Sequence, residues 1–240
     1  MPEIITLPEV DSTNNYLKSN KEFWKKNFLT IRAIRQTKGR GRLTKEWFST
    51  ERDLTFSFVY LPQTTITENL PLVTLHSGLA IYRVLLKIVE KDLYIKWPND
   101  IYYKESKLAG ILTELVMNNE NKIMIVGIGI NVNSKSDTID NRPVTSLFNI
   151  LKTPVHIENL LLDLMDEIEK TLGNITAPLT RKFKTEWMNS INNKIFYQKY
   201  QGSTLVEFKI TGLTDLGELV VDVDGTRQII RDGEINLISR

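Results

Sequence analysis

Two apolar runs, residues 108–116 and 123–132, flank a short polar segment, residues 118–121 (NNEN), and this arrangement constrains the fold more than any other feature. Apolar runs joined by a short Asn-rich turn are typical of an antiparallel β-hairpin. If residues 118–121 form the turn, the numbers of two opposed residues sum to about 239, give or take one register step. The sequence therefore predicts a long hairpin in which Gly110 lies opposite Gly129.

This register makes one patch of the hairpin unusual. Glycines that face each other leave the sheet without side chains, so that a ligand can lie against the backbone. The same register brings Lys107 opposite Asn131 or Val132, at one end of the patch. Alternatively, Gly127 and Gly129 only relieve packing beneath a helix. The hairpin alone is compatible with both interpretations.

The remaining periodicity predicts helices and strands through most of the chain. Strands are expected at residues 4–7, 28–35, 55–61 and 93–97, and helices at residues 13–20, 70–89, 157–172 and 178–191. The helix at 70–89 is apolar on most faces, which indicates burial. In the amphipathic helix at 157–172, Glu167 and Glu169 are expected on the solvent side.

Beyond about residue 192 the pattern changes to short alternating β segments, at residues 195–200, 205–210, 218–223, 226–230 and 234–238. Turns that contain glycine or aspartate separate most of them. Several short strands in close succession favour a small β barrel. We therefore expect two domains, residues 1–191 and residues 192–240.

Composition excludes several classes of protein. The formal net charge is only +2, so long-range attraction to nucleic acid is not expected. The absence of cysteine excludes disulfides and cysteine-ligated metals. His76 and His156 have no metal-ligand spacing, and His76 is expected to pack in the core. Neither a signal peptide nor an apolar run of about 20 residues is apparent, so we expect a cytoplasmic protein without a membrane segment.

The segment from Gly39 to Trp47, which we call the arginine loop, concentrates positive charge on flexible backbone. Arg40 and Arg42 alternate with Gly39 and Gly41, a pattern that suits an anion that is covered after it binds. A solvated loop with incidental charge is a plainer interpretation, and a nucleic-acid patch is a third. The loop is not a Walker A motif, because the second glycine of that motif is absent.

Five segments, in order and at compatible spacing, resemble the catalytic core of biotin–protein ligases. They are residues 11–14 (DSTN), 36–47 (QTKGRGRLTKEW), 96–100 (KWPND), 107–110 (KLAG) and 127–131 (GIGIN). The resemblance covers nearly the whole chain. It implies an α+β fold, with a mixed sheet flanked by helices and a small C-terminal SH3-like β barrel. Relatives often carry an N-terminal DNA-binding domain, whereas this chain starts at the catalytic core, so no role with nucleic acid is implied.

The resemblance also implies an activity. Members of this family activate biotin with ATP to biotinyl-5′-AMP and then transfer biotin to a lysine of the biotin carrier domain of a carboxylase. The implied catalytic residues are Lys107, Arg42 and Asp100. The implied biotin-binding residues are Ser12, Thr13, Asn14, Gln36, Gly39, Arg40, Gly41, Arg42, Lys107 and Gly110, and the implied nucleotide-binding residues are Trp47, Asn99 and Asn131.

Further expectations concern the ion, the partners and one departure from the family pattern. ATP and Mg²⁺ are expected as co-substrate and ion, without a permanently bound cofactor. Asp100 either holds Mg²⁺ or accepts the proton of the acceptor lysine. Thr44 and Lys45 stand where the family has Gly-Arg, and lysine keeps the charge but loses the bidentate fork. Loop ordering is therefore expected to be weaker, and Lys45 is left unassigned.

Two other functions remain open at this point. A lipoate–protein ligase-like enzyme shares the fold and the adenylation chemistry, and a non-catalytic biotin-binding protein would use the C-terminal barrel for interactions. The presence of Lys107 together with Arg40 and Arg42 favours an enzyme. The oligomeric state stays open, with a homodimer as one alternative, and so does the identity of the acceptor carboxylase.

Overall fold

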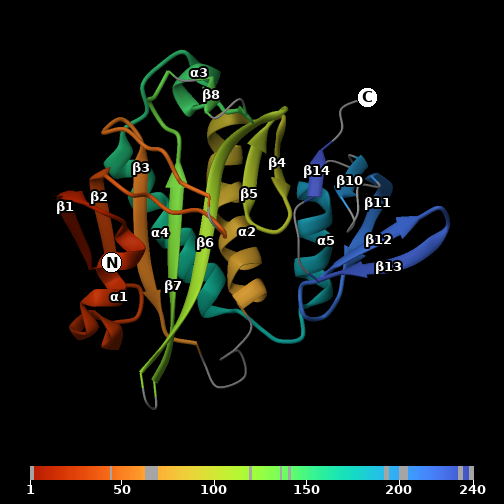
Figure 1. Cartoon of the computed structure of the whole chain (residues 1–240), viewed down its shortest axis with the longest axis horizontal. Helices are drawn as coiled ribbons and strands as arrows, with labels where there is room; N and C mark the ends of the chain where they lie inside the picture. The colour runs from red at the N-terminus through yellow and green to blue at the C-terminus, as the bar shows by residue number, and fades with distance from the viewer. Residues whose placement is uncertain are drawn as a thin grey trace.

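The computed structural model describes residues 3–43, 45–62, 70–118, 121–135, 137–139, 142–191, 195–199, 205–231 and 235–237. A seven-stranded mixed sheet with the order β1-β2-β3-β7-β6-β5-β4 forms the larger part (Figure 1). Its strands are β1 (Ile4–Val10), β2 (Thr30–Gln36), β3 (Leu54–Tyr60), β4 (Leu93–Lys96), β5 (Asp100–Tyr103), β6 (Ser106–Asn118) and β7 (Asn121–Ile130). Only β1 and β2 run parallel, and the other neighbours in this sheet are antiparallel.

The predicted hairpin is confirmed. Strands β6 and β7 pair in the expected register, with Asn118 opposite Asn121 and Gly110 opposite Gly129. The regular pairing ends at Ala109 and Ile130, however. On the edge of β6 that pairs with β7, Lys107 instead forms a bridge with Val144, so the expectation that it lies directly across from Asn131 or Val132 is wrong, although the Asn131 side chain still reaches the Lys107 carbonyl. The cause is the segment that follows β7, because the Thr145 amide donates to the Lys107 carbonyl at 2.9 Å. The opposite edge of β6 pairs with β5, a four-residue strand that the sequence pattern did not reveal.

Two long helices cover one face of the sheet, and a short helix covers part of the other (Figure 1). Helices α2 (Leu70–Val89) and α4 (Ile157–Gly173) pack on a core that includes Phe56, Phe58 and Met124. On the opposite face, Leu17 of α1 (Thr13–Ser19) packs with Ile125 of β7. Because side chains alternate along a strand, Gly127 and Gly129 lie on the same face as Ile125, the one that carries α1.

Helix α2 corrects one expectation. By length and composition alone, this helix is apolar enough to cross a membrane. From the sequence, no segment of that kind was expected. In the fold, 67% of its 18-residue apolar window is buried. His76 within it is 5% exposed and stacks on Phe183, as expected of a packed core residue. The hydropathy of α2 therefore reflects its place in the core.

The smaller elements complete the larger domain. They are the 3-10 helix η1 (Lys21–Lys25), the two-residue strands β8 (Thr138–Ile139) and β9 (Arg142–Pro143), helix α3 (Leu147–Leu151) and helix α5 (Arg181–Ser190). Helix α3 was not expected from the sequence, because it has only five residues and its first turn is fixed by Ser146, whose hydroxyl accepts from the Asn149 amide.

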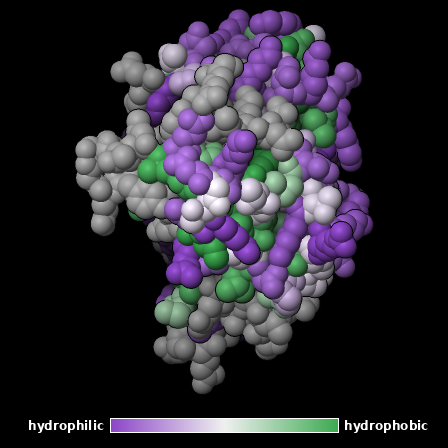
Figure 2. All heavy atoms as spheres, turned by 90° about the vertical axis from the view of Figure 1, so that its right-hand side faces the viewer, coloured by the Kyte–Doolittle hydropathy of each residue, from purple (hydrophilic) through white to green (hydrophobic). Residues whose placement is uncertain are grey.

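The C-terminal strands form one antiparallel sheet with the order β13-β12-β11-β10-β14. They are β10 (Ile195–Lys199), β11 (Leu205–Leu213), β12 (Leu219–Val223), β13 (Thr226–Ile230) and β14 (Ile235–Leu237), close to the five predicted segments. The α+β fold class with a small SH3-like C-terminal unit is thus confirmed. Phe208 and Leu219 pack with Trp187 of α5 and Leu75 of α2, and the division at residue 192 stays a prediction. Figure 2 shows this side of the molecule, where apolar side chains are interspersed among polar ones.

One charged cluster joins three helices beside this interface. The guanidinium group of Arg83 in α2 makes two hydrogen bonds of 2.6 Å to Glu186 of α5. It also donates at 2.8 Å to Glu167 and at 3.0 Å to Thr171, both in α4. Glu167 was expected to be solvated, and the partner that draws it inward lies on a helix distant in sequence.

Candidate active site

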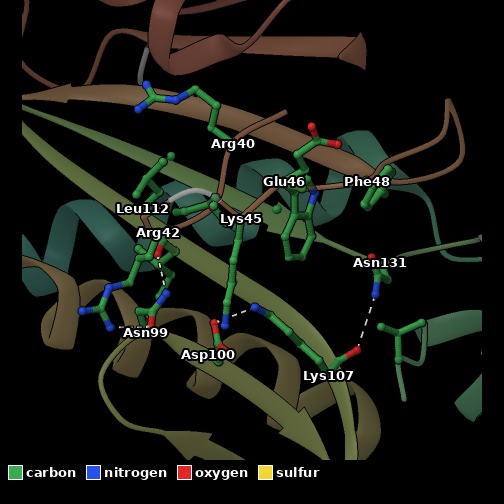
Figure 3. A pocket seen from close by; sticks show the side chains of 18 of the residues that line it. Arg40, Arg42, Lys45, Glu46, Phe48, Asn99, Asp100, Lys107, Leu112 and Asn131 are labelled. Atoms are coloured by element: carbon green, nitrogen blue, oxygen red, sulfur yellow. Dashed lines mark hydrogen bonds and ion pairs between the residues drawn. The ribbon is translucent and has the colours of Figure 1, made fainter. Parts of the chain in front are cut away.

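A cavity of about 390 Å³ opens on the α1 face of the sheet, between α1, the arginine loop and β5–β7 (Figure 3). Among the predicted site residues, those that line it are Ser12, Thr13, Asn14, Gln36, Arg40, Gly41, Arg42, Trp47, Asn99, Asp100, Lys107, Gly110 and Asn131. Gly39 is not among the lining residues. A Cβ at Gly39 would lie 2.2 Å from the Trp47 carbonyl oxygen, so the glycine permits the loop to fold back on itself. The structure thus brings together segments spread over more than a hundred residues.

The glycines of β6 and β7 form the floor of the cavity, but it is not bare. A Cβ at Gly129 would lie 2.2 Å from Cε2 of the Trp47 indole, and one at Gly127 would lie 2.2 Å from Oδ1 of Asn14. The expected patch without side chains is therefore covered by Trp47 and Asn14. The glycines are needed because these two side chains approach the backbone so closely.

Lys107 and Asp100 form an ion pair beside the indole. The Lys107 Nζ lies 2.8 Å from Oδ1 of Asp100 and 5.4 Å from the centre of the Trp47 ring. Both charged side chains are largely shielded from solvent, with exposed fractions of 29% and 19%. A cation held between a carboxylate and an aromatic ring in a cleft is placed to meet a second anion.

The residues around this pair are fixed by backbone contacts. The Asn99 amide donates to the Ile111 carbonyl at 2.9 Å, and its Oδ1 accepts from Arg42 at 3.5 Å. The Asn131 amide donates to the Thr145 carbonyl at 3.0 Å and to the Lys107 carbonyl at 3.4 Å. These bonds hold both amides in set orientations at the edge of the cavity.

A hydrogen-bond network occupies the other end of the site. Gln36 Oε1 accepts from the Thr13 amide at 2.8 Å and from the Thr13 hydroxyl at 3.1 Å. The buried Ser57 hydroxyl lies 2.6 Å from Thr13 Oγ1 and 2.5 Å from Asn14 Oδ1. The Asn14 amide in turn donates to Glu114 Oε2 at 2.8 Å. These contacts connect α1, β2, β3 and β6.

Arg40 joins this network and not the Lys107 end. Its guanidinium lies 3.1 Å from Glu114 Oε1 and donates to Asn15 at 3.0 Å. Figure 3 shows it pointing away from Asp100 and Lys107. Burial favours a raised pKa for Glu114, but the hydrogen bonds from Lys18 and Asn14 and the charges of Lys18 and Arg40 outweigh it and lower the pKa.

Comparison with known proteins gives this site a context. A profile of the Biotin/lipoate A/B protein ligase family matches residues 7–131, which is more than half of the chain. The chain belongs to this family. It is 35% identical over 134 residues to the bifunctional ligase/repressor BirA of Escherichia coli, covering 54% of this chain and 40% of that protein. It is 36% identical over 106 residues to the Bacillus spizizenii BirA, covering 44% of this chain and 33% of that protein. The chain thus spans about a third to two fifths of these curated relatives.

A solved structure matches over the full length. The biotin protein ligase of Aquifex aeolicus in complex with biotin and ATP superposes with a TM-score of 0.83 at 31% identity, and 100% of each chain is covered. The structure of the same enzyme's R40G mutant with biotin superposes with a TM-score of 0.81. The likeness includes the C-terminal β unit, which lies outside the residues that the family profile matches.

Several residues that line the cavity of this family member were not assigned a role from the sequence, although Gly127 and Gly129 belong to the predicted glycine patch. They are Lys45, Glu46, Phe48, Lys96, Trp97, Pro98, Tyr102, Glu105, Ile111, Leu112, Gly127, Ile128, Gly129, Ile139, Arg142, Pro143 and Val144. Figure 3 shows the Lys45 side chain extending toward Asp100, so the lysine that departs from the family pattern lies in the cavity. Lys96 and Trp97 lie in a motif that could have signalled them. Arg142 follows no apolar or glycine pattern that would have marked it.

The expected Mg²⁺ ion would depend on a carboxylate in the cavity of this family member. Among the described residues, no group of three His, Cys, Asp or Glu side chains is placed to hold a metal ion. Asp100 is the carboxylate beside Lys107 in the cavity. Mg²⁺ at nucleotide sites commonly takes one or two protein carboxylates together with substrate phosphates and water, so a single carboxylate fits this ion.

Proposed function

We propose that this chain is a biotin–protein ligase that activates biotin with ATP and transfers it to a lysine of a carboxylase's biotin carrier domain. One observation carries the proposal: Lys107, Asp100, Arg42 and Trp47 meet in one cavity on the glycine floor of the hairpin. The full-length likeness to an Aquifex aeolicus enzyme solved with biotin and ATP supports the same reaction.

In the first step, an oxygen of the biotin carboxylate attacks the α-phosphorus of ATP, the bond to the bridging oxygen breaks, and pyrophosphate leaves. This brings anions together, so the site must supply positive charge where negative charge develops. Lys107 and Arg42 supply it. Asp100 would hold Mg²⁺, which would supply further positive charge against the phosphates. Asn99, Asn131 and Trp47 hold the adenine.

The biotin ring system lies at the opposite end of the cavity, next to the hydrogen-bond network. Ser12, Thr13, Asn14 and Gln36 line this end. The Gln36 Oε1 already accepts two hydrogen bonds from Thr13. The Gln36 amide nitrogen is therefore the group that donates to an acceptor on the ligand. Gly110 and Gly41 also line the cavity.

In the second step, the amine of the acceptor lysine attacks the acyl carbon, and AMP leaves with the electrons of the broken anhydride bond. The amine must lose a proton, because the pKa of a free lysine is about 10.4. Asp100 is the carboxylate placed to take it, as the alternative to its role with Mg²⁺. The arginine loop excludes water from the anhydride between the two steps.

The acceptor, the compartment and the assembly state belong to the proposal as well. We place the chain in the cytoplasm with a carrier domain as its protein partner, and a homodimer is one form of assembly. A lipoate ligase is the second candidate, because the matched family includes both kinds of ligase. The arginine loop and the C-terminal β unit favour biotin.

Calorimetric titration separates these candidates. Biotin should bind the purified chain with measurable heat, and lipoate should bind at least about a hundredfold more weakly, because a site built to hydrogen-bond the ureido group is left unpaired by lipoate. Equal affinities, or tighter binding of lipoate, would overturn the assignment.

A further inference from the structure

Glu114 of β6 contacts both the arginine loop and helix α1. It sits in an otherwise apolar run of β6, yet both carboxylate oxygens are engaged. Oε1 lies 2.5 Å from Lys18 Nζ and 3.1 Å from Arg40, and Oε2 accepts from Asn14 at 2.8 Å. Among these partners, Arg40 belongs to the loop, whereas Lys18 and Asn14 belong to α1.

The arginine loop is shaped by hydrogen bonds within it and is attached to the rest of the fold by other contacts. The Gly41 amide donates to the Lys45 carbonyl at 2.8 Å, and the Trp47 amide donates to the Gly39 carbonyl at 3.0 Å. These bonds shape the loop, and its side chains attach it to the rest of the fold through Trp47 on Gly129, Arg42 on Asn99 and Arg40 on Glu114. Arg40 supplies one side-chain attachment through Glu114, with exposed fractions of 39% for the Arg40 side chain and 18% for that of Glu114. A charge-assisted contact to a half-buried carboxylate is stronger than a surface ion pair.

The same carboxylate also reaches the predicted biotin end of the site. Glu114 orients the Asn14 amide, Asn14 Oδ1 meets the Ser57 hydroxyl, and that hydroxyl meets Thr13. Thr13 then fixes Gln36, the last residue of β2, shortly before the arginine loop begins. A continuous chain of hydrogen bonds therefore runs from Arg40 in the loop to Gln36 at its base.

We propose that Glu114 is a positioning residue that latches the arginine loop shut through Arg40 and, through Asn14, sets the geometry of the biotin end of the cavity. In this proposal Arg40 is the loop residue that contacts Glu114, while Arg42 and Lys107 face the reacting groups. The second half of this inference rests on the proposed function, and the first half does not.

Hydrogen exchange tests the latch without any reference to activity. In Glu114→Gln, the charge is lost while the shape is kept, and exchange in the peptide spanning the arginine loop should rise about tenfold. Glu9→Gln is the matched control, because Glu9 pairs with Arg35 on the surface at 3.1 Å and its loss should leave the loop unchanged. Loop exchange in Glu114→Gln that equals wild type would overturn the latch.

A second variant guards against general destabilisation. Arg40→Gln removes the guanidinium that contacts Glu114 but leaves Glu114 with Lys18 and Asn14. It should therefore raise exchange in the loop and not in β6 or β7. The double variant should exchange no faster in the loop than Arg40→Gln alone, because both substitutions remove the Arg40–Glu114 contact and only Arg40→Gln also removes the bond to Asn15. Additive effects, or a rise spread evenly over β6 and β7, would show a merely structural role.

Kinetics tests the second half. In Glu114→Gln, the KM for biotin should rise about tenfold with kcat changed by less than about threefold, the pattern of lost binding interactions. An unchanged KM with faster loop exchange would keep the latch and overturn its link to the biotin end. A wild-type chain without biotin-dependent activity would instead overturn the proposed function, and the exchange data would still decide on the latch.

Discussion

The indole of Trp47 packs so closely against Gly129 that a Cβ at residue 129 would lie 2.2 Å from the ring. The two residues come from the arginine loop and from β7, so this contact fixes where the loop meets the sheet. Gly110, opposite Gly129, would place its Cβ 3.0 Å from the same ring. The position of the loop therefore depends on the hairpin register, which places the two glycines opposite each other beneath the Trp47 ring.

Replacing Gly129 by alanine tests this contact. A methyl group there forces the indole away, and we expect a loss of about 1–3 kcal/mol in the free energy of unfolding together with faster exchange in the arginine loop. Gly78→Ala in α2 is the matched control, because the added Cβ would lie at an ordinary 3.5 Å from Ile111 of β6. That variant should be neutral or stabilised by up to about 1 kcal/mol. Urea denaturation measures both, and equal stabilities for the two variants would contradict the contact.

Lys107→Ala tests the charge at the reacting end. Loss of one preorganised donor typically lowers the rate about 10²–10³-fold, and we expect that loss in biotin-dependent pyrophosphate exchange. Lys91→Ala, a change of the same type on an exposed residue, should keep the wild-type rate. Near wild-type exchange in Lys107→Ala would remove this lysine from the mechanism.

Arg83→Met tests the cluster that joins α2, α4 and α5. The substitution leaves Glu186 and Glu167 without their guanidinium partner, and we expect a loss of about 2 kcal/mol in stability. The hydrogen bonds from Arg83, which are the main cause of the lowered pKa of Glu186, are lost at the same time. Lys170→Met removes an exposed ion pair with Asp166 and should change stability far less. Thermal or urea unfolding of the two variants gives the comparison, and equal losses would contradict a structural role for the cluster.

His76 predicts a pH dependence of stability. Burial, with a smaller contribution from the charge of Arg83, lowers its pKa from 6.5 to about 4. Between those values the folded ring stays neutral while the unfolded chain binds a proton, so stability falls as the pH drops below 6.5. The loss from this group reaches up to about 3 kcal/mol near pH 4.

His76→Phe keeps a ring to stack on Phe183 but cannot titrate. Carboxylates titrate alike in both proteins, so the difference between the two unfolding free energies isolates the histidine. That difference should change in favour of the variant as the pH falls from 7 to 5. Parallel curves over this range would contradict the assignment.

The sequence predicted what depends on local pattern. The hairpin register followed from the turn, and α2 began and ended at the predicted residues. Strand β5 was not predicted, because a segment of only four residues shortly after a Trp-Pro pair carries little periodicity. Its formation depends on pairing with β4 and β6. Short strands of this kind are set by their neighbours more than by propensity.

The candidate site was predicted in part, for a similar reason. The motifs identified the segments that line the cavity, but not which partner each side chain chooses. Arg40 was grouped with Arg42, yet its guanidinium meets Glu114, a residue more than seventy positions away. Glu114 carried one available signal, a carboxylate within an apolar strand, because buried charges are paired in folded proteins. The identity of its partners came from tertiary packing.

The central claim is that this chain activates biotin by adenylation. Exchange of labelled pyrophosphate into ATP by the purified wild-type chain measures that step without a carrier protein. We expect exchange that requires biotin and is not supported by lipoate. Exchange with lipoate but not biotin, or no exchange with either acid in the presence of Mg²⁺ and ATP, would contradict the claim.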